Sequence, residues 1–192
     1  MRTLILAVAA LLIVSAALSD TMVEPGSKTS FPANLNLFGP NGSIELKALG
    51  TGLRKKVIIK VYAGCFYVDK TAELGADRAR AAIEGDFAKR IEMRFLRDVD
   101  SKSIAGAYEE GIRKTLTGHD AEVLGFCGLF TAEVKSGESI VLSYMPGWGL
   151  IAEQAGKELG RVTDPELIRA IWATWFGADP VSKDLKAGLL GL

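Results

Sequence analysis

The chain has 192 residues, and its 23 acidic residues balance its 23 basic residues, so that the formal net charge at pH 7 is zero. This balance excludes a polycationic nucleic-acid-binding protein and a chain with an acidic tail. A single histidine, and two cysteines without a Cys-x-x-Cys spacing, argue against a zinc site. We therefore expect no metal, no cofactor and no nucleic-acid partner.

The N-terminus has the layout of a secretory signal peptide. Arg2 precedes an apolar run over residues 4–18, and small residues surround a predicted cleavage after Ser19. The run of about 15 residues is shorter than the ~20 needed for a membrane-spanning helix, and the alternative is an uncleaved N-terminal anchor. We expect residues 1–19 to be the signal peptide, residues 20–30 a flexible lead-in and residues 31–192 one domain. The protein should then be exported to the periplasm and touch a membrane only through its signal segment.

Strand patterns dominate the first half of this domain. Asn41 and Gly42 lie between apolar segments and predict a β-hairpin. Residues 43–50 and 56–68 are rich in β-branched and aromatic residues, which predicts two strands. Residues 71–85 are rich in alanine and in charges of both signs, and they predict a surface helix. Residues 89–96 predict another strand, in which alternate apolar side chains share one face: Ile91, Met93 and Phe95.

Helices and strands are mixed in the second half of the domain. Asp100 is a predicted N-cap for a helix that runs through Leu116, and residues 120–134 predict a second helix that two glycines weaken. Residues 138–147 and 149–162 predict strands with a turn near Ala155, and residues 164–176 and 182–190 predict helices. These elements favour the α+β class, a mostly antiparallel sheet with helices packed on one face.

The sequence lacks the common catalytic signatures: a Gly-x-Ser-x-Gly elbow, a phosphate-binding loop and a Rossmann glycine pattern. His119 lies in a polar segment between two predicted helices, where a cap or solvent contact is expected. Glu109 and Arg113 have the four-residue spacing of a surface ion pair. Cys65 and Cys127 lie in apolar stretches and are expected to be buried free thiols, with a disulfide as the alternative after export.

The segment LGTGLRKKVIIKVYAGCFYVDK, residues 49–70, strongly resembles the N-terminal motif of the chalcone isomerase-like superfamily, in its bacterial exported branch. The resemblance continues through residues 89–112, through YMPGWGL and GKELG, and into the ending IWATWFGADPVSKDLKAGLLG. It implies that family's open-faced β-sandwich, a large antiparallel sheet with a layer of helices and a ligand cleft between them. Members of the family close a flavanone ring, bind fatty acids without catalysis, or act as non-catalytic auxiliary proteins.

Two residues of the motif are the candidate site residues. Arg54 matches the arginine that steadies developing negative charge in the isomerases and holds the carboxylate in the fatty-acid binders. A guanidinium suits both roles because it offers a planar fork of donors to an anion. Tyr62 stands where the isomerases carry a catalytic threonine, and the fatty-acid binders have a tyrosine near this place.

The spacing of these two residues sets a geometric condition. In one straight strand, eight residues would separate Arg54 from Tyr62 by roughly 26 Å at ~3.3 Å per residue. They can share a ligand only if the chain turns or bulges near residues 55–57. The tyrosine and asparagine of the plant enzymes have no counterpart, because residues 100–116 contain no asparagine and Tyr108 lies one to two turns too late.

We therefore expect an exported protein that binds a fatty acid or similar amphipathic anion without catalysis, through Arg54 and Tyr62. One alternative is an intramolecular lyase of the chalcone isomerase type, with the same two residues as catalytic groups. The other is a structural or assembly factor of the envelope. The sequence does not give the oligomeric state.

Overall fold

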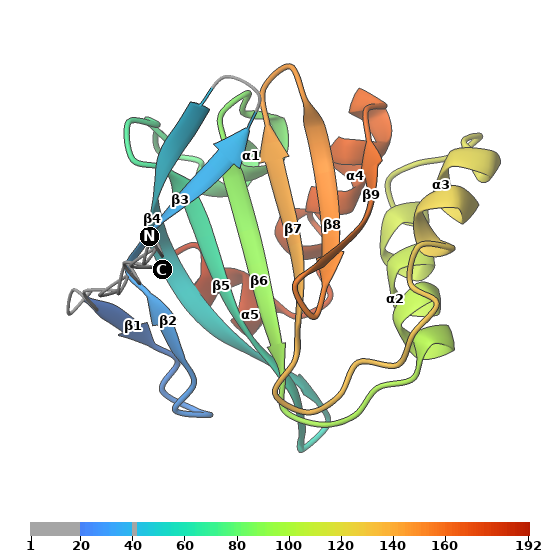
Figure 1. Cartoon of the computed structure of the whole chain (residues 1–192), viewed down its shortest axis with the longest axis horizontal. Helices are drawn as coiled ribbons and strands as arrows, with labels where there is room; N and C mark the ends of the chain where they lie inside the picture. The colour runs from blue at the N-terminus through green and yellow to red at the C-terminus, as the bar shows by residue number, and fades with distance from the viewer. Residues whose placement is uncertain (1–19, 40–41) are drawn as a thin grey trace, which may run out of the picture.

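A seven-stranded antiparallel sheet dominates the computed structural model, which describes residues 20–39 and 42–192. Each strand pairs with its neighbour in the sequence, in the order β3-β4-β5-β6-β7-β8-β9 (Figure 1). The strands are β3 Asn34–Gly39, β4 Gly42–Lys56, β5 Ile59–Asp69, β6 Lys89–Phe95, β7 Ser139–Met145, β8 Gly149–Gln154 and β9 Lys157–Val162.

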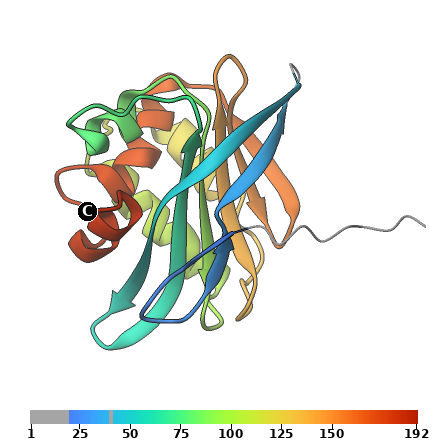
Figure 2. The same cartoon turned by 90° about the vertical axis from the view of Figure 1, so that its left-hand side faces the viewer.

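The helices gather on one face of this sheet (Figure 2). They are α1 Arg78–Glu84, α2 Ser101–Arg113, α3 Asp120–Cys127, α4 Pro165–Phe176 and α5 Lys183–Leu189. The predicted α+β class and its open-faced sandwich are confirmed. None of the helices in residues 20–39 and 42–192 has the length and apolar character of a membrane span. The predicted signal peptide, residues 1–19, lies outside the described residues.

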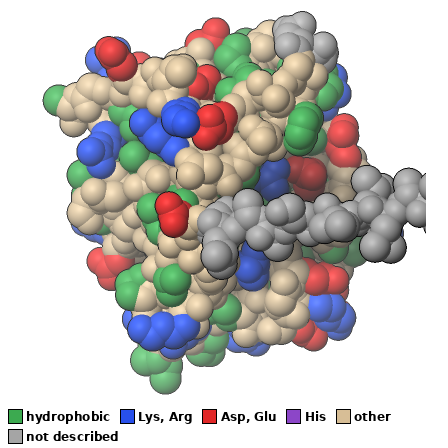
Figure 3. All heavy atoms as spheres, turned by 60° about the vertical axis from the view of Figure 1, so that its left-hand side comes forward, with side chains coloured by type: hydrophobic (Ala, Val, Ile, Leu, Met, Phe, Trp, Pro, Cys, Tyr) green, Lys and Arg blue, Asp and Glu red, His purple; other side chains and the backbone are tan. Residues whose placement is uncertain are grey.

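A small hairpin packs on the other face of the sheet. Its strands are β1 Thr21–Val23 and β2 Ser30–Pro32. Residues 20–30, expected as a flexible lead-in, thus contain β1 and the first residue of β2. Phe31 is fully buried in a core cluster with Leu46 and Tyr67, so the hairpin covers part of this face. Charged side chains of both signs are spread over the face shown in Figure 3, in keeping with the balanced composition.

Three predicted helix starts are confirmed by their capping hydrogen bonds. Asp100 accepts from the Ser103 N–H at 2.8 Å, and Asp164 accepts from the Leu167 N–H at 2.7 Å. Ser182 does the same for α5. Each cap satisfies a backbone donor that has no partner inside the helix.

Two predicted helices are shorter than expected. The helix expected over residues 71–85 begins only at Arg78, because Gly75 takes a φ of 63° and Asp77 caps the helix after it. The helix expected over residues 120–134 ends at Cys127. The chain beyond it turns back, and Val134 forms an isolated β-bridge with Val99.

The two faces of the sheet bury separate core clusters. Ile91, Met93 and Phe95 all lie in the cluster under the helices, which confirms their predicted common face. Cys127 belongs to this cluster and Cys65 to the cluster on the other face. Both cysteines are free and buried, as expected.

The glycines of the opening motif allow a close contact between β4 and α5. A Cβ on Gly50 would lie 2.1 Å from the Gly188 carbonyl oxygen, and one on Gly52 would lie 2.9 Å from the Leu185 carbonyl oxygen. Any larger residue would push α5 away from the strand. The register of β4 on β5 also shifts between Ala48 and Gly50, so this part of the motif is irregular, as its glycines suggested.

Candidate functional site

A hairpin turn brings the two candidate residues together. The predicted strand over residues 56–68 is wrong at its start, because β4 continues through Arg54 to Lys56 and β5 begins only at Ile59. The residues between them, Val57 and Ile58, form the turn. Arg54 and Tyr62 are therefore direct partners on adjacent antiparallel strands, and the condition set by their spacing is met.

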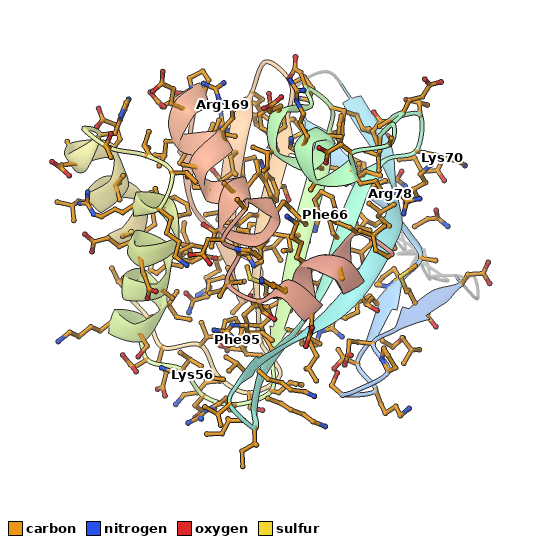
Figure 4. The ribbon with its side chains drawn as sticks, turned by 180° about the vertical axis from the view of Figure 1, so that it is seen from behind. Lys56, Phe66, Lys70, Arg78, Phe95 and Arg169 are labelled. Atoms are coloured by element: carbon orange, nitrogen blue, oxygen red, sulfur yellow. The ribbon has the colours of Figure 1, made fainter. Side chains whose placement is uncertain are left out.

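Both residues line a cavity of about 410 Å³ between the sheet and α2 and α4. The exposed area of its walls is more apolar than polar, and Arg54 and Lys56 line it at the end where Lys56 and Phe95 are labelled near α2 in Figure 4. The apolar lining comprises Val61, Met93, Phe95, Val99, Ile104, Ala107, Ile140 and Val181. The polar lining comprises Arg54, Lys56, Tyr62, Ser103, Tyr108, Glu110, Lys114, Thr174 and Trp175. The cavity is amphipathic.

The Tyr62 hydroxyl is set up as a hydrogen-bond donor. Tyr62 is 8% exposed, and its oxygen accepts a hydrogen bond from the Trp175 indole N–H at 3.1 Å. Burial raises the pKa of Tyr62 to about 12, although the Trp175 bond and the Arg54 charge oppose this rise. The phenol thus keeps its proton at neutral pH. Since Trp175 occupies an acceptor position, the O–H remains able to donate to an anion in the cavity.

Arg54 brings a positive charge to the same cavity without an acidic partner. Its guanidinium donates to the Lys55 carbonyl oxygen. Within residues 20–39 and 42–192, neither Arg54 nor Lys56 forms an ion pair. Lys114, also on the lining, is paired with Asp179 at 2.8 Å. Among the residues that the structure describes, Arg54 and Lys56 thus offer two unpaired positive charges to an anion, against one unpaired acidic side chain on the lining, Glu110.

Comparison with known proteins agrees with the fold and with the motif. A family model described as chalcone isomerase-like matches residues 29–191. The chain belongs to the chalcone isomerase-like family. A solved structure of an Arabidopsis thaliana fatty-acid binding protein is similar, with a TM-score of 0.72 and 25% sequence identity. The match covers 89% of this chain and 96% of the plant protein, and no curated protein sequence matches.

In this member of the chalcone isomerase-like family, Tyr108 is a cavity residue that the sequence analysis did not select. Its ring stacks on Phe130 at 4.7 Å between centroids and meets Trp175 edge-on. Burial, with Tyr62 nearby, raises the pKa of Tyr108 well above its usual value. The helical stripe of Ile104, Tyr108 and Ile112 was the available signal, since it predicts that Tyr108 faces the core.

The remaining candidates lie outside the cavity. His119 stands at the junction of α2 and α3, where Nδ1 is 3.2 Å from the Thr117 carbonyl oxygen and Nε2 is 3.5 Å from Glu166. Arg113 forms the predicted ion pair with Glu109 at 2.9 Å. Both are surface contacts, as the sequence indicated.

Proposed function

We propose that this protein binds a fatty acid or a similar amphipathic anion in the cavity without catalysis. Arg54 and the Tyr62 hydroxyl hold the carboxylate, and the apolar walls enclose the chain. The observation that carries this proposal is the direct pairing of Arg54 with Tyr62 on the lining of an amphipathic cavity.

The apolar part of the cavity suits an alkyl chain. Its volume of about 410 Å³ lies within the roughly 300–1,000 Å³ typical of small-molecule sites. Each buried methylene contributes about 0.8 kcal/mol, so chain length should set much of the affinity. The fatty-acid binding function of the structurally similar plant protein supports the same class of ligand.

The polar end suits a carboxylate. Arg54 has no acidic partner in the described part of the chain, and a guanidinium stays charged at any physiological pH. A hydrogen bond to a charged group contributes roughly 1.5–3 kcal/mol, so Arg54 should supply a large share of the affinity for the acid. Tyr62 adds a neutral donor on the adjacent strand.

The binding experiment compares Arg54→Met with Lys55→Met in delipidated protein, by calorimetric titration with a long-chain fatty acid. Lys55 is a matched control because it is basic, exposed and adjacent, yet does not line the cavity. We expect Arg54→Met to weaken binding roughly ten- to a hundredfold, and Lys55→Met to leave it unchanged.

The methyl ester of the same fatty acid provides the second arm. It keeps the chain and loses the carboxylate charge, so it should bind the wild type and Arg54→Met equally weakly. If the wild type bound the acid and the ester with equal affinity, Arg54 would not hold the carboxylate and the proposal would be refuted. Ring closure of a chalcone faster than the uncatalysed reaction, and lost in Arg54→Met, would instead assign an isomerase.

We further propose that the protein acts outside the cytoplasm, on the strength of the basic, apolar and small-residue order in residues 1–19. The mass of protein purified from a periplasmic fraction tests this. A mass that matches residues 20–192 supports export and cleavage after Ser19. A mass that matches all 192 residues, found in the membrane fraction, supports an uncleaved anchor.

A further inference from the structure

The turn between β4 and β5 exposes a group of large apolar side chains. Val57 is 90% exposed, Ile58 is 86% exposed and Ile59 is 48% exposed. We call residues 57–59 the hairpin tip. It is the lowest point of the molecule in Figure 1, and hydrophobic side chains project at the lower end of the surface in Figure 3, beneath a group of Lys and Arg side chains.

Folding stability does not explain the residues at the tip. The loop has two residues, and Val57 takes a φ of 59°. A β-branched residue rarely adopts a positive φ, and tight hairpin turns that need one favour glycine or asparagine. Neither Val57 nor Ile58 gains burial in return. A strained, apolar, solvent-facing turn indicates that the side chains serve a contact outside the chain.

The charges around the tip indicate the partner. Residues 54–60 contain four basic residues and no acidic one. In the described part of the chain none of these four forms an ion pair, although the Lys60 ammonium donates to the Gly26 carbonyl oxygen at 2.7 Å. Glu24 is near Lys60, but its carboxylate accepts hydrogen bonds from the Gly26 and Ser27 N–H groups. Basic residues therefore flank the apolar tip on both strands, with the acidic Glu24 and Asp184 on a hollow that Lys55 and Val57 also line.

We propose that the hairpin tip inserts into the surface of a lipid bilayer that contains anionic headgroups. Apolar side chains with basic neighbours are the combination that binds such an interface. A protein partner fits less well, because a convex two-residue turn offers far less than the roughly 1,200 Å² that a stable interface buries. This contact lies beyond the N-terminal segment, within the folded domain.

Docking of the hairpin tip would also fix where the cavity lies relative to the bilayer. Arg54 and Lys56 come directly before the tip, Val61 and Tyr62 come soon after it, and all four line the cavity. A docked tip would hold the charged end of the cavity at the headgroups, where an amphipathic anion enters or leaves the bilayer. This consequence rests on the proposed function, whereas the docking itself does not.

Vesicle flotation without added fatty acid tests the docking. The test variant Val57→Asn/Ile58→Gly installs a favoured turn pair and removes the apolar side chains. The matched control is Phe38→Asn, since Phe38 is 74% exposed at the opposite end of the sheet. On vesicles of phosphatidylcholine with phosphatidylglycerol, we expect the tip variant to bind at least about tenfold more weakly than the wild type, and the control to bind as the wild type does. Binding should also fall with added salt and on phosphatidylcholine alone.

A fluorescent label gives a second readout that does not depend on the turn variant folding. Ile58→Cys and Phe38→Cys are each labelled with an environment-sensitive dye, while the native Cys65 and Cys127 are buried. The label at position 58 should brighten and shift to the blue with anionic vesicles, and the label at position 38 should not. Equal responses at both positions, or none, overturn the proposal. A change of oligomeric state in Val57→Asn/Ile58→Gly without vesicle binding by the wild type would also overturn it, in favour of self-association.

Discussion

Two basic side chains stand at opposite ends of the helix-facing side of the sheet, and their surroundings differ. Lys89, the first residue of β6, is 1% exposed, and its ammonium lies 5.0–5.6 Å from the centroids of the Phe87, Tyr144 and Trp172 rings. Arg54, at the other end, lines an open cavity. One cation is enclosed by the protein, and the other faces free space.

The two cations also differ in the groups that surround them, and this difference supports the proposed ligand site at Arg54. The Lys89 ammonium donates to the Gly85 carbonyl oxygen at 2.8 Å, and burial lowers the pKa of Lys89 to about 8 although Asp86 opposes the shift. The enclosed cation is thus held by internal groups and can also lose its charge. Only one backbone carbonyl, that of Lys55, accepts a hydrogen bond from the Arg54 guanidinium. The proposed anion would add a partner at the Arg54 end, whereas internal groups already surround the Lys89 ammonium.

The largest expected effect on fatty-acid binding comes from filling the cavity at Arg54 with a larger side chain. Ile104→Trp on α2 places an indole in the cavity, since Ile104 is buried on its lining. Fatty-acid binding should fall by at least about a hundredfold, because the alkyl chain loses the space and the buried area that drive binding. Titration calorimetry measures the loss.

Lys102→Trp is the control for this change, because Lys102 lies on the same helix but is exposed and does not line the cavity. It should bind fatty acid as the wild type does, and circular dichroism should show both variants folded. Undiminished binding by Ile104→Trp would place the ligand elsewhere.

The second prediction concerns the enclosed end and its pH dependence. A lysine whose pKa falls from 10.5 to about 8 on folding costs roughly 3 kcal/mol while it is charged. Because the unfolded chain binds more protons between these values, this cost is constant below pH 8 and is relieved as the pH rises toward 10.5. Lys89→Met should therefore stabilise the fold by about 2 kcal/mol below pH 8, after the lost carbonyl bond and ring contacts are subtracted.

Urea unfolding of Lys89→Met and wild type at several pH values measures this difference. The stabilisation should shrink as the pH rises above 8, while fatty-acid binding at neutral pH stays unchanged. A difference that does not depend on pH would mean that Lys89 is not the buried titrating group.

The smallest effects compare two tyrosines of β5 that face opposite sides of the sheet. Tyr62→Phe should weaken fatty-acid binding about fivefold, since it removes one hydrogen-bond donor. Tyr67 is fully buried on the other face, and its hydroxyl has only the weakly hydrogen-bonding Cys65 thiol near it, with no hydrogen-bond partner of good geometry in the described residues. Tyr67→Phe should leave binding unchanged and stabilise the fold by up to about 1 kcal/mol, because an unsatisfied polar group is removed. If Tyr67→Phe weakened binding and Tyr62→Phe did not, the ligand would lie on the face of the sheet opposite the helices, and the proposed site would be wrong.

The sequence predicted those features that depend on local chemistry. The cap at Asp100 and the helix starts at Asp164 and Ser182 follow from side chains that satisfy nearby N–H groups. The alternation of Ile91, Met93 and Phe95 follows from strand geometry. Arg54 and Tyr62 were selected through the family motif, and the structure places both on one cavity.

The turn and the cavity could not be predicted in the same way. Val57 and Ile58 have the composition of a strand, and neither carries the glycine or asparagine that marks a tight turn. The pairing of Arg54 with Tyr62 depends on this turn. Tyr108 joins the site because α2 lines the same cavity as β5 and β6, a tertiary arrangement that helical periodicity does not specify.

The central claim is that the ligand carboxylate lies at Arg54, and the ionisation of a bound fatty acid labelled with ¹³C at its carboxyl carbon tests it most directly. Nuclear magnetic resonance follows that carbon through a pH titration in the wild type and in Arg54→Met, at ligand concentrations that saturate both. If the guanidinium lies beside the carboxylate, the midpoint in the wild type should be roughly 1–3 pH units lower than in Arg54→Met. Identical midpoints in the two proteins would contradict the claim.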